Sequence, residues 1–223
     1  MILRLVVTDG TQSPAVAESV EVAADGAISG WRSVSEGGVG WFAGRLPAGE
    51  LAAIQALAGA VTAAPPAEPP PPGSGQQVLE LPATGPVPIA AIADGPGEWP
   101  ALAAAARRLL DRLTAFPRAA VAVTPDGRLV HRGTEPLRLD LSTIAVRVTA
   151  WRGYYEPASD WDNVVEGPSE VEAGPGWAYD LPFDLEVQAG VTLHLTADFA
   201  VLSGTTRILV RAKHTPAIDP AGN

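Results

Sequence analysis

The first 45 residues carry short apolar runs that are separated by turn signals. The run ILRLVV at 2–7 ends near an Asp-Gly pair, and residues 15–22 alternate between apolar and polar side chains. Two more short runs, 27–34 and 39–45, flank a Glu-Gly-Gly sequence. Runs of this length, bounded by such turn residues, are typical of β-strands. The pattern therefore predicts a β-meander at the start of the chain.

Two later segments repeat apolar residues at the spacing of an α-helix. The first follows Leu46-Pro47, has apolar residues at 51, 54, 57, 58 and 61, and should end near residue 62. The second runs from about residue 98 to 115, with leucines and alanines on one face and three arginines on the other. Proline suits the first helical position because its missing N–H would have no partner there. We expect two helices, each with one buried face.

A proline-rich sequence, PPAEPPPPGSG at 65–75, separates the two helices. Consecutive prolines favour extended polyproline II, and Gly-Ser sequences are flexible. Strand candidates follow at 78–81 and 87–93, so each side of the stretch carries strands and one helix. A segment of about 60 residues buries little core alone. We therefore interpret residues 62–77 as a mobile loop inside one α+β domain, residues 1–117. The alternatives are an interdomain tether or a ligand for a proline-reading partner.

Beyond Pro117 the chain shows strand patterns and no helix of useful length. The expected strands are 119–123, 129–131, 137–141, 144–151, 185–187, 191–199 and 207–212. Several short strands at this spacing predict an antiparallel β-sandwich or open barrel over residues 118–214. Residues 215–223 read as a flexible tail. The predicted fold is thus an α+β N-terminal domain, with strands and two helices, followed by an all-β antiparallel sandwich-like domain.

Composition and charge narrow the class of protein. Hydrophobic residues make up 47% and charged residues 18%, which is typical of a folded chain. The formal net charge of −10 leaves no positive footprint for phosphates, so we expect no nucleic-acid partner. The absence of cysteine excludes thiol nucleophiles and thiolate metal sites. A single lysine, Lys213, among fifteen basic residues, with abundant Ala, Gly and Pro, indicates a GC-rich bacterial genome.

No segment of the sequence reads as a membrane or export signal. The N-terminal run turns polar by Thr8, without the features of a signal peptide. The longest Ala/Leu-rich stretch, 51–64, is too short to span a bilayer. We expect a soluble, cytoplasmic protein without a membrane partner, and the sequence does not specify its oligomeric state.

Aromatic and acidic residues gather in WRGYYEPASDWDNVVEGPSEVE at 151–172. Tyrosine and tryptophan are enriched at binding hot spots because they offer large contact areas at low entropic cost. The predicted binding residues are Trp151, Tyr154, Tyr155, Trp161 and, from the following turn-rich segment at 174–184, Trp177. Other interpretations are a long inter-strand loop whose aromatics cap the core and, for 174–184, core anchors or a platform for carbohydrate.

Four oxygen-bearing residues of the same stretch are candidate ligands for Ca²⁺, a hard cation. They are Asp160, Asp162, Asn163 and Glu166. Their spacing differs from that of an EF-hand loop. The alternative is that these side chains are simply solvated.

No catalytic motif is evident. His194 and Asp198 alternate with the apolar residues of a predicted strand, so His194 should face solvent. The chain lacks a G-x-S-x-G elbow and an H-E-x-x-H motif, and Gly37–Gly40 lacks the spacing of a dinucleotide loop. Carboxylate pairs of the glycosidase kind are possible among 25 acidic residues, but nothing singles one out.

The order of elements around FAGRLP at 42–47 and EWPALAAAARRLLDRL at 98–113 also resembles a known family. Strands, this motif, an Ala/Leu helix, a proline-rich loop, strands and a second helix resemble the small bacterial metalloprotease inhibitors called emfourins, over residues 1–116. The resemblance implies a protein inhibitor of a peptidase.

These observations favour a non-catalytic protein-binding or adaptor protein whose partner is another protein and which needs no cofactor. The alternatives are a peptidase inhibitor and a carboxylate-dependent hydrolase.

Overall fold

The computed structural model describes residues 1–9, 16–33, 37–61, 63, 75–116, 120–152, 156–183, 191–204 and 206–214. Its strands pair antiparallel throughout the described registers, and its helices are few. The chain divides into two compact units. Unit 1 comprises Met1–Ser33 and Phe42–Ala115, and unit 2 comprises Val34–Trp41 and Phe116–Asn223.

Unit 1 is built on an antiparallel sheet whose strand order is β4-β3-β2-β1-β5-β6. The strands are β1 (Leu3–Asp9), β2 (Val16–Val22), β3 (Ala27–Arg32), β4 (Gly38–Arg45), β5 (Gln76–Leu81) and β6 (Gly85–Pro88). β1 is central because it pairs with β2 on one side and β5 on the other. Its Leu3 and Leu5 lie opposite Val22 and Val20, and all four side chains are fully buried. The predicted meander is confirmed.

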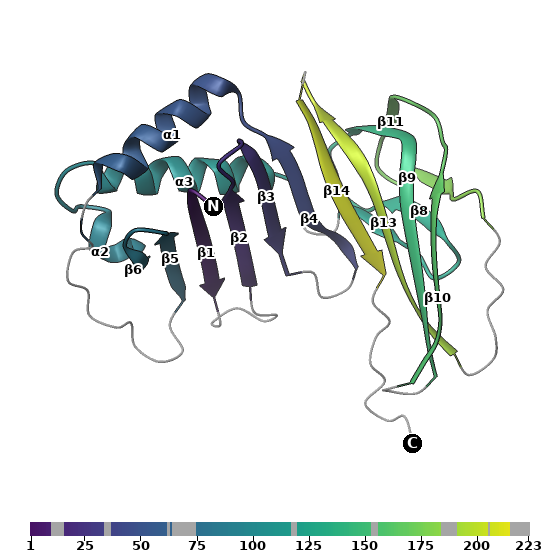
Figure 1. Cartoon of the computed structure of the whole chain (residues 1–223). Helices are drawn as coiled ribbons and strands as arrows, with labels where there is room; N and C mark the ends of the chain where they lie inside the picture. The colour runs from purple at the N-terminus through teal and green to yellow at the C-terminus, as the bar shows by residue number, and fades with distance from the viewer. Residues whose placement is uncertain are drawn as a thin grey trace. The chain divides into compact units, whose positions relative to one another are not determined.

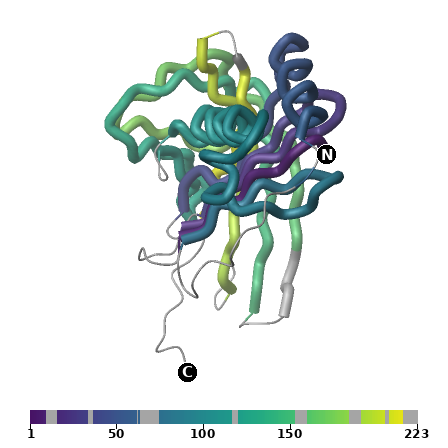
Figure 2. The backbone as a smooth tube through the Cα atoms, turned by 90° about the vertical axis from the view of Figure 1, so that its left-hand side faces the viewer, coloured from purple at the N-terminus to yellow at the C-terminus, as the bar shows by residue number. Residues whose placement is uncertain are grey.

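Three helices accompany this sheet: α1 (Ala48–Ala60), α2 (Ile89–Ile92) and α3 (Trp99–Leu113). α3 packs on β1 and β2 and runs across the strands of unit 1 in Figure 1; Figure 2 looks along it. Gly30 permits this packing, because a Cβ atom there would lie 3.3 Å from the side chain of Leu113. The indole of Trp99 donates a hydrogen bond of 3.0 Å to the carbonyl of Ala63. The two predicted helices are thus present.

The strand predicted for 87–93 is wrong in its second half. β6 ends at Pro88, and residues 89–92 form the short helix α2. Pro88 stands at the N-cap with φ −60° and ψ 133°, so the chain leaves the strand at a proline and turns at once.

Unit 2 contains a large sheet in the order β10-β9-β13-β14, continued by residues 38–41 of β4. The predicted first domain included residues 37–41, which cluster with unit 2 here. The strands are β9 (Leu137–Arg152), β10 (Glu156–Val165), β11 (Val171–Ala173), β13 (Val191–Ser203) and β14 (Thr206–His214). β11 pairs with the start of β9. A small sheet has the order β12-β8-β7, from β7 (Val121–Val123), β8 (Arg128–His131) and β12 (Ala178–Asp180).

The core of unit 2 lies on one face of the large sheet, and β7 contacts β13 and β14. Leu195, Ala197 and Phe199 on β13 are fully buried, whereas His194 is exposed. This confirms the alternation predicted for 191–199. The buried side chains described in unit 2 are mainly Leu, Val, Ile and Ala.

The long loop expected across 151–172 is wrong, because residues 156–165 form β10 and residues 171–173 form β11. Asp and Asn have low β-propensity, but pairing with β9 outweighs it. The predicted strands 137–141 and 144–151 are one strand, β9, whose pairing with β13 changes register between Asp198 and Ala200.

Some predictions fall on residues that lie outside the described part of the chain. These are most of the proline-rich stretch, the strand at 185–187, the tail at 215–223, and Tyr154 and Tyr155. Within the described residues, none of the helices has the length and apolar character needed to cross a bilayer.

Candidate functional site

Strand β10 carries the candidate site, and we call Asp160, Trp161, Asp162, Asn163 and Val164 the β10 surface. Each is exposed, although they belong to a strand that is paired with β9. Side chains alternate along a strand, so residues 160, 162 and 164 lie on one face and residues 161 and 163 on the other. The surface therefore presents two faces of different chemistry along one strand.

The core-side face of this strand has an incompletely covered tryptophan. Trp161 lies opposite the buried Val148 of β9 and retains 38% of its surface exposed. Its ring centroid lies 5.2 Å from that of Phe183, with the planes tilted by 36°. Val164, on the other face, is 59% exposed. The β10 surface thus presents two large apolar side chains to solvent.

The outer face carries an ion pair between strands. Arg147 of β9 lies opposite Asp162 and donates from Nε to Oδ1 at 2.7 Å and from Nη2 to Oδ2 at 2.9 Å. These hydrogen bonds hold the pKa of the Asp162 carboxyl below its usual range and raise the pKa of Arg147. Both side chains are largely exposed, so the pair orients Asp162 more than it stabilises the fold.

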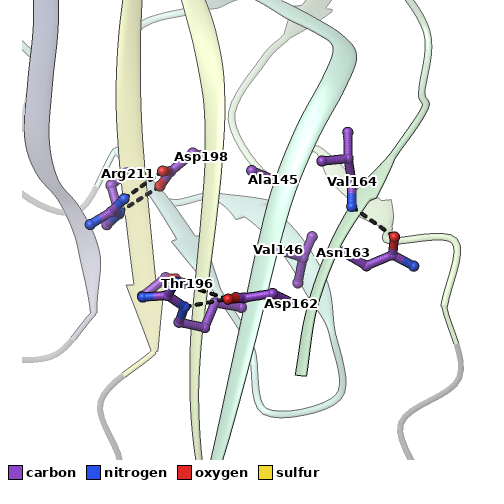
Figure 3. Close-up of a pocket in the computed structure, with 9 residues that line it drawn as sticks. Ala145, Val146, Asp162, Asn163, Val164, Thr196, Asp198 and Arg211 are labelled. Carbon is purple, nitrogen blue, oxygen red and sulfur yellow. Dashed lines mark hydrogen bonds and ion pairs between the residues drawn. The ribbon is translucent and has the colours of Figure 1, made fainter. Parts of the chain in front are cut away.

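A second ion pair lies two strands away on the same sheet. Arg211 of β14 donates two hydrogen bonds of 2.6 Å to Asp198 of β13 (Figure 3). The guanidinium of Arg211 also lies 5.4 Å from the ring centroid of Trp41. The hydrogen bonds from Arg211 to Asp198 raise the pKa of Arg211. Both ion pairs line one hollow on the outer face of the sheet, and Thr196 lines it as well.

This hollow has a volume of about 460 Å³ and opens to solvent. Its two carboxylates are both engaged by arginines, at Asp162 and Asp198. Acid catalysis by a carboxylic acid requires a raised pKa, and the pKa of Asp162 is lowered. The hollow therefore supplies no observation in favour of the hydrolase alternative.

The four candidate calcium ligands are not brought together. Asn163 lies on the opposite face of β10 from Asp160 and Asp162, and Glu166 follows the end of the strand. The Oδ1 atom of Asn163 accepts a hydrogen bond of 2.8 Å from the backbone N–H of Val164 (Figure 3). Across the described ranges, no three His, Asp or Glu side chains are grouped so that they could hold a metal ion.

The three predicted tryptophans, which lie in the described part of the chain, do not form one cluster. Trp151, near the end of β9, shares the face of Arg147, opposite to that of Trp161, and its ring lies edge-on to His194 with centroids 6.3 Å apart. Trp177 belongs to the segment before β12, where it stacks on Tyr179 with centroids 6.2 Å apart and planes within 4°. Of these three tryptophans, Trp161 is the one that belongs to the β10 surface.

Two members of the site were not predicted from the sequence. Val164 was part of the segment but was not singled out. Phe183, which contacts Trp161 from 22 residues further along the chain, belongs to the segment 174–184 that was interpreted as core anchors or a carbohydrate platform. Alternation within DWDNVV would have indicated Val164 as an apolar residue on the acidic face, had the segment been recognised as a strand.

Comparisons with family models, curated proteins and solved structures give no match to the chain. The resemblance of residues 1–116 to emfourins stays a prediction, and so does the inhibitor function that it implies.

Proposed function

We propose that the chain is a non-catalytic protein-binding or adaptor protein that contacts another protein through the β10 surface. The observation that carries the proposal is the exposure of Trp161 (38%) and Val164 (59%) on one strand. Exposed large apolar side chains bordered by charges are typical of protein-binding surfaces. Tryptophan in particular is enriched among residues that dominate binding energy.

The proposal also includes the fold class of each unit and the compartment in which the protein acts. Unit 1 is an α+β domain, and unit 2 is an antiparallel sandwich-like domain in which β7 faces β13 and β14. The contacts of α3 with β1 and β2, and of β7 with the large sheet, support these assignments. The protein acts in the bacterial cytoplasm, requires no cofactor, and presents unit 2 to its partner.

Trp161→Ala tests the proposal. A partner is first isolated by co-purification with the wild-type chain from its native host, and its affinity is then measured with purified components. A hot-spot tryptophan contributes about 2 kcal/mol or more, so the variant should bind at least about 30-fold more weakly. Because Trp161 also contacts Phe183, thermal unfolding must show that the variant remains folded at the assay temperature.

The matched control is Trp31→Ala, which removes a tryptophan of similar exposure (45%) from β3 in unit 1. It should bind as the wild type does. Unchanged affinity of a folded Trp161→Ala variant, or an equal loss in both variants, would contradict the proposal.

A further inference from the structure

We propose that the partner binds by adding an extended, basic segment as a new strand along the open side of β10. This inference rests on the proposed function and specifies how the β10 surface is used. In the described part of unit 2, β10 is hydrogen-bonded to β9 alone and stands at the end of the sheet order. Strand addition to a sheet edge derives its affinity from main-chain hydrogen bonds and its specificity from neighbouring side chains.

The hydrogen bond at Val164 shows which backbone groups are available. In an antiparallel strand, the N–H and C=O of one residue point to the same side, and successive residues alternate. The backbone N–H of Val164 donates a hydrogen bond to the Asn163 side chain, so the N–H and C=O of Val164 point away from β9. The register is continuous from Ser159 to Val165, and the backbone groups of Asp160 and Asp162 therefore also point outward.

Asn163 occupies this edge with its own side chain. Its Oδ1 atom takes the position that a carbonyl of an added strand would occupy at the Val164 N–H. The contact spans one residue and is exposed, so the Asn163 side chain can rotate away when a partner carbonyl replaces it. The Val164 N–H therefore has a hydrogen-bond acceptor in the free protein, and a carbonyl of an added strand can replace that acceptor.

The end strand of unit 1, β6, is protected against strand addition, in contrast to β10. β6 carries Pro86 and Pro88, which have no N–H to offer to an added strand. Prolines and charges are the usual protection of exposed edges. In β10 the only proline is Pro157, beside the register shift, and the stretch from Ser159 to Val165 contains none.

Charge selects a basic segment over a second copy of this chain. Asp160, Asp162 and Glu166 are exposed along or just beyond the strand. Pairing two β10 edges would bring these carboxylates together across the new ladder, and like charges opposite one another are destabilising. The net charge of −10 repels a second copy and attracts a basic segment from a distance. Lysine or arginine at alternate positions would face Asp160, and Asp162 beside its partner Arg147, while apolar residues would meet Trp161.

The probe is a fluorescent peptide of alternating lysine and valine, eight residues long with blocked ends, and its glutamate–valine counterpart is the control. Binding is followed by anisotropy at physiological salt. We expect saturable binding of the basic peptide only. Slowed hydrogen exchange of the Val164 amide on binding should accompany it, because that N–H would then be held in a ladder.

Three variants separate strand addition from general charge attraction. Val164→Pro removes the outward N–H at an edge position that tolerates proline, and should weaken peptide binding at least tenfold while urea unfolding stays close to wild type. Val164→Ala keeps the N–H and shortens the exposed side chain, so it should lose less affinity than Val164→Pro, and the difference between the two variants measures the contribution of the N–H. Asn163→Ala removes the competing acceptor and should tighten binding about two- to tenfold.

Equal peptide affinity in all three variants would overturn the inference, and so would a wild-type dimer in sedimentation that Val164→Pro dissociates. If Trp161→Ala no longer binds the isolated partner but Val164→Pro still does, strand addition is wrong and the proposed function stands. If Trp161→Ala retains the partner, the proposed function itself fails.

Discussion

Gly167 closes the end of β10 against β9, and the structure predicts that Gly167→Ala will destabilise unit 2. The N–H of Gly167 donates to the carbonyl of Leu141 at 2.9 Å, and the N–H of Leu141 donates to the carbonyl of Pro168 at 3.1 Å. A Cβ atom on residue 167 would lie 2.8 Å from the Tyr179 hydroxyl and 2.9 Å from the Leu141 carbonyl oxygen. Neither distance is tolerated, so both contacts must relax through movement of the neighbours or of residue 167 itself.

The magnitude follows from what can move. Leu141 belongs to β9 and its side chain is fully buried, so its carbonyl has little room to move. Tyr179 is held by stacking on Trp177. Overpacking of this kind costs about 1–3 kcal/mol. Lengthening the Gly167–Leu141 hydrogen bond adds about 1 kcal/mol, and the lower chain entropy of unfolded alanine returns about 0.4–1 kcal/mol. The net loss of unfolding free energy is about 1–3 kcal/mol.

Urea unfolding followed by tryptophan fluorescence measures this loss. With a slope of about 2 kcal/mol per molar, the midpoint should fall by about 0.5–1.5 M. The control is Gly174→Ala, because a Cβ there would meet no described atom within 4 Å. That control should change stability by less than about 0.5 kcal/mol. Adding Tyr179→Phe to Gly167→Ala removes one of the two contacts and should restore part of the loss.

The reasoning would be refuted if Gly167→Ala and Gly174→Ala had the same midpoint. A Tyr179→Phe change that brought no recovery would place the whole strain on the Leu141 carbonyl.

Two further predictions concern the core and the pH dependence of unit 2. Phe199→Ala should lower the unfolding free energy by about 3–5 kcal/mol because the ring is fully buried, whereas the exposed Ser203→Ala on the same strand should change it by less than about 0.5 kcal/mol; urea midpoints decide. Burial, with smaller contributions from His194 and Arg132, lowers the pKa of His214 from 6.5. The unfolded chain therefore binds the proton more tightly, so the His214 contribution to stability is present above pH 6.5 and is lost as the pH falls through the folded-state pKa. His214→Gln should show a smaller loss of midpoint between pH 8 and pH 5, and equal losses in both proteins would contradict this.

The helices and several strands could be predicted because their local patterns match their final environments. The apolar residues of α3 recur at helical spacing and are buried, whereas Ile54 is the one buried residue within α1, beside the half-buried Leu51 and Leu57. The alternation of 193–199 matches a strand with one buried face. The break that separates 137–141 from 144–151 in the sequence also has a counterpart in the structure. There β9 continues, but its pairing with β13 shifts register.

The candidate site was predicted only as a set of residue types. Trp161, Asp160, Asp162 and Asn163 were singled out, but as parts of a loop that gathers aromatics or ligands around a cation. In the structure, register with β9 assigns each of them to one face or the other, so Trp161 and Trp151 lie on opposite faces, and so does Asn163 relative to Asp160 and Asp162.

By itself, the sequence determined an acidic, cysteine-free chain with two apolar helical faces and many strands, since these properties depend on composition and on neighbours three or four residues apart. Only the tertiary structure decided that 156–165 is a strand, because its polar residues acquire β structure through hydrogen bonds to β9. It also decided which edge of β10 is open. Pairing with β9 occupies one edge of the strand, and the backbone N–H groups that do not point toward β9 point to the other edge. Such pairing joins distant parts of the chain, and local pattern does not specify which strands become partners.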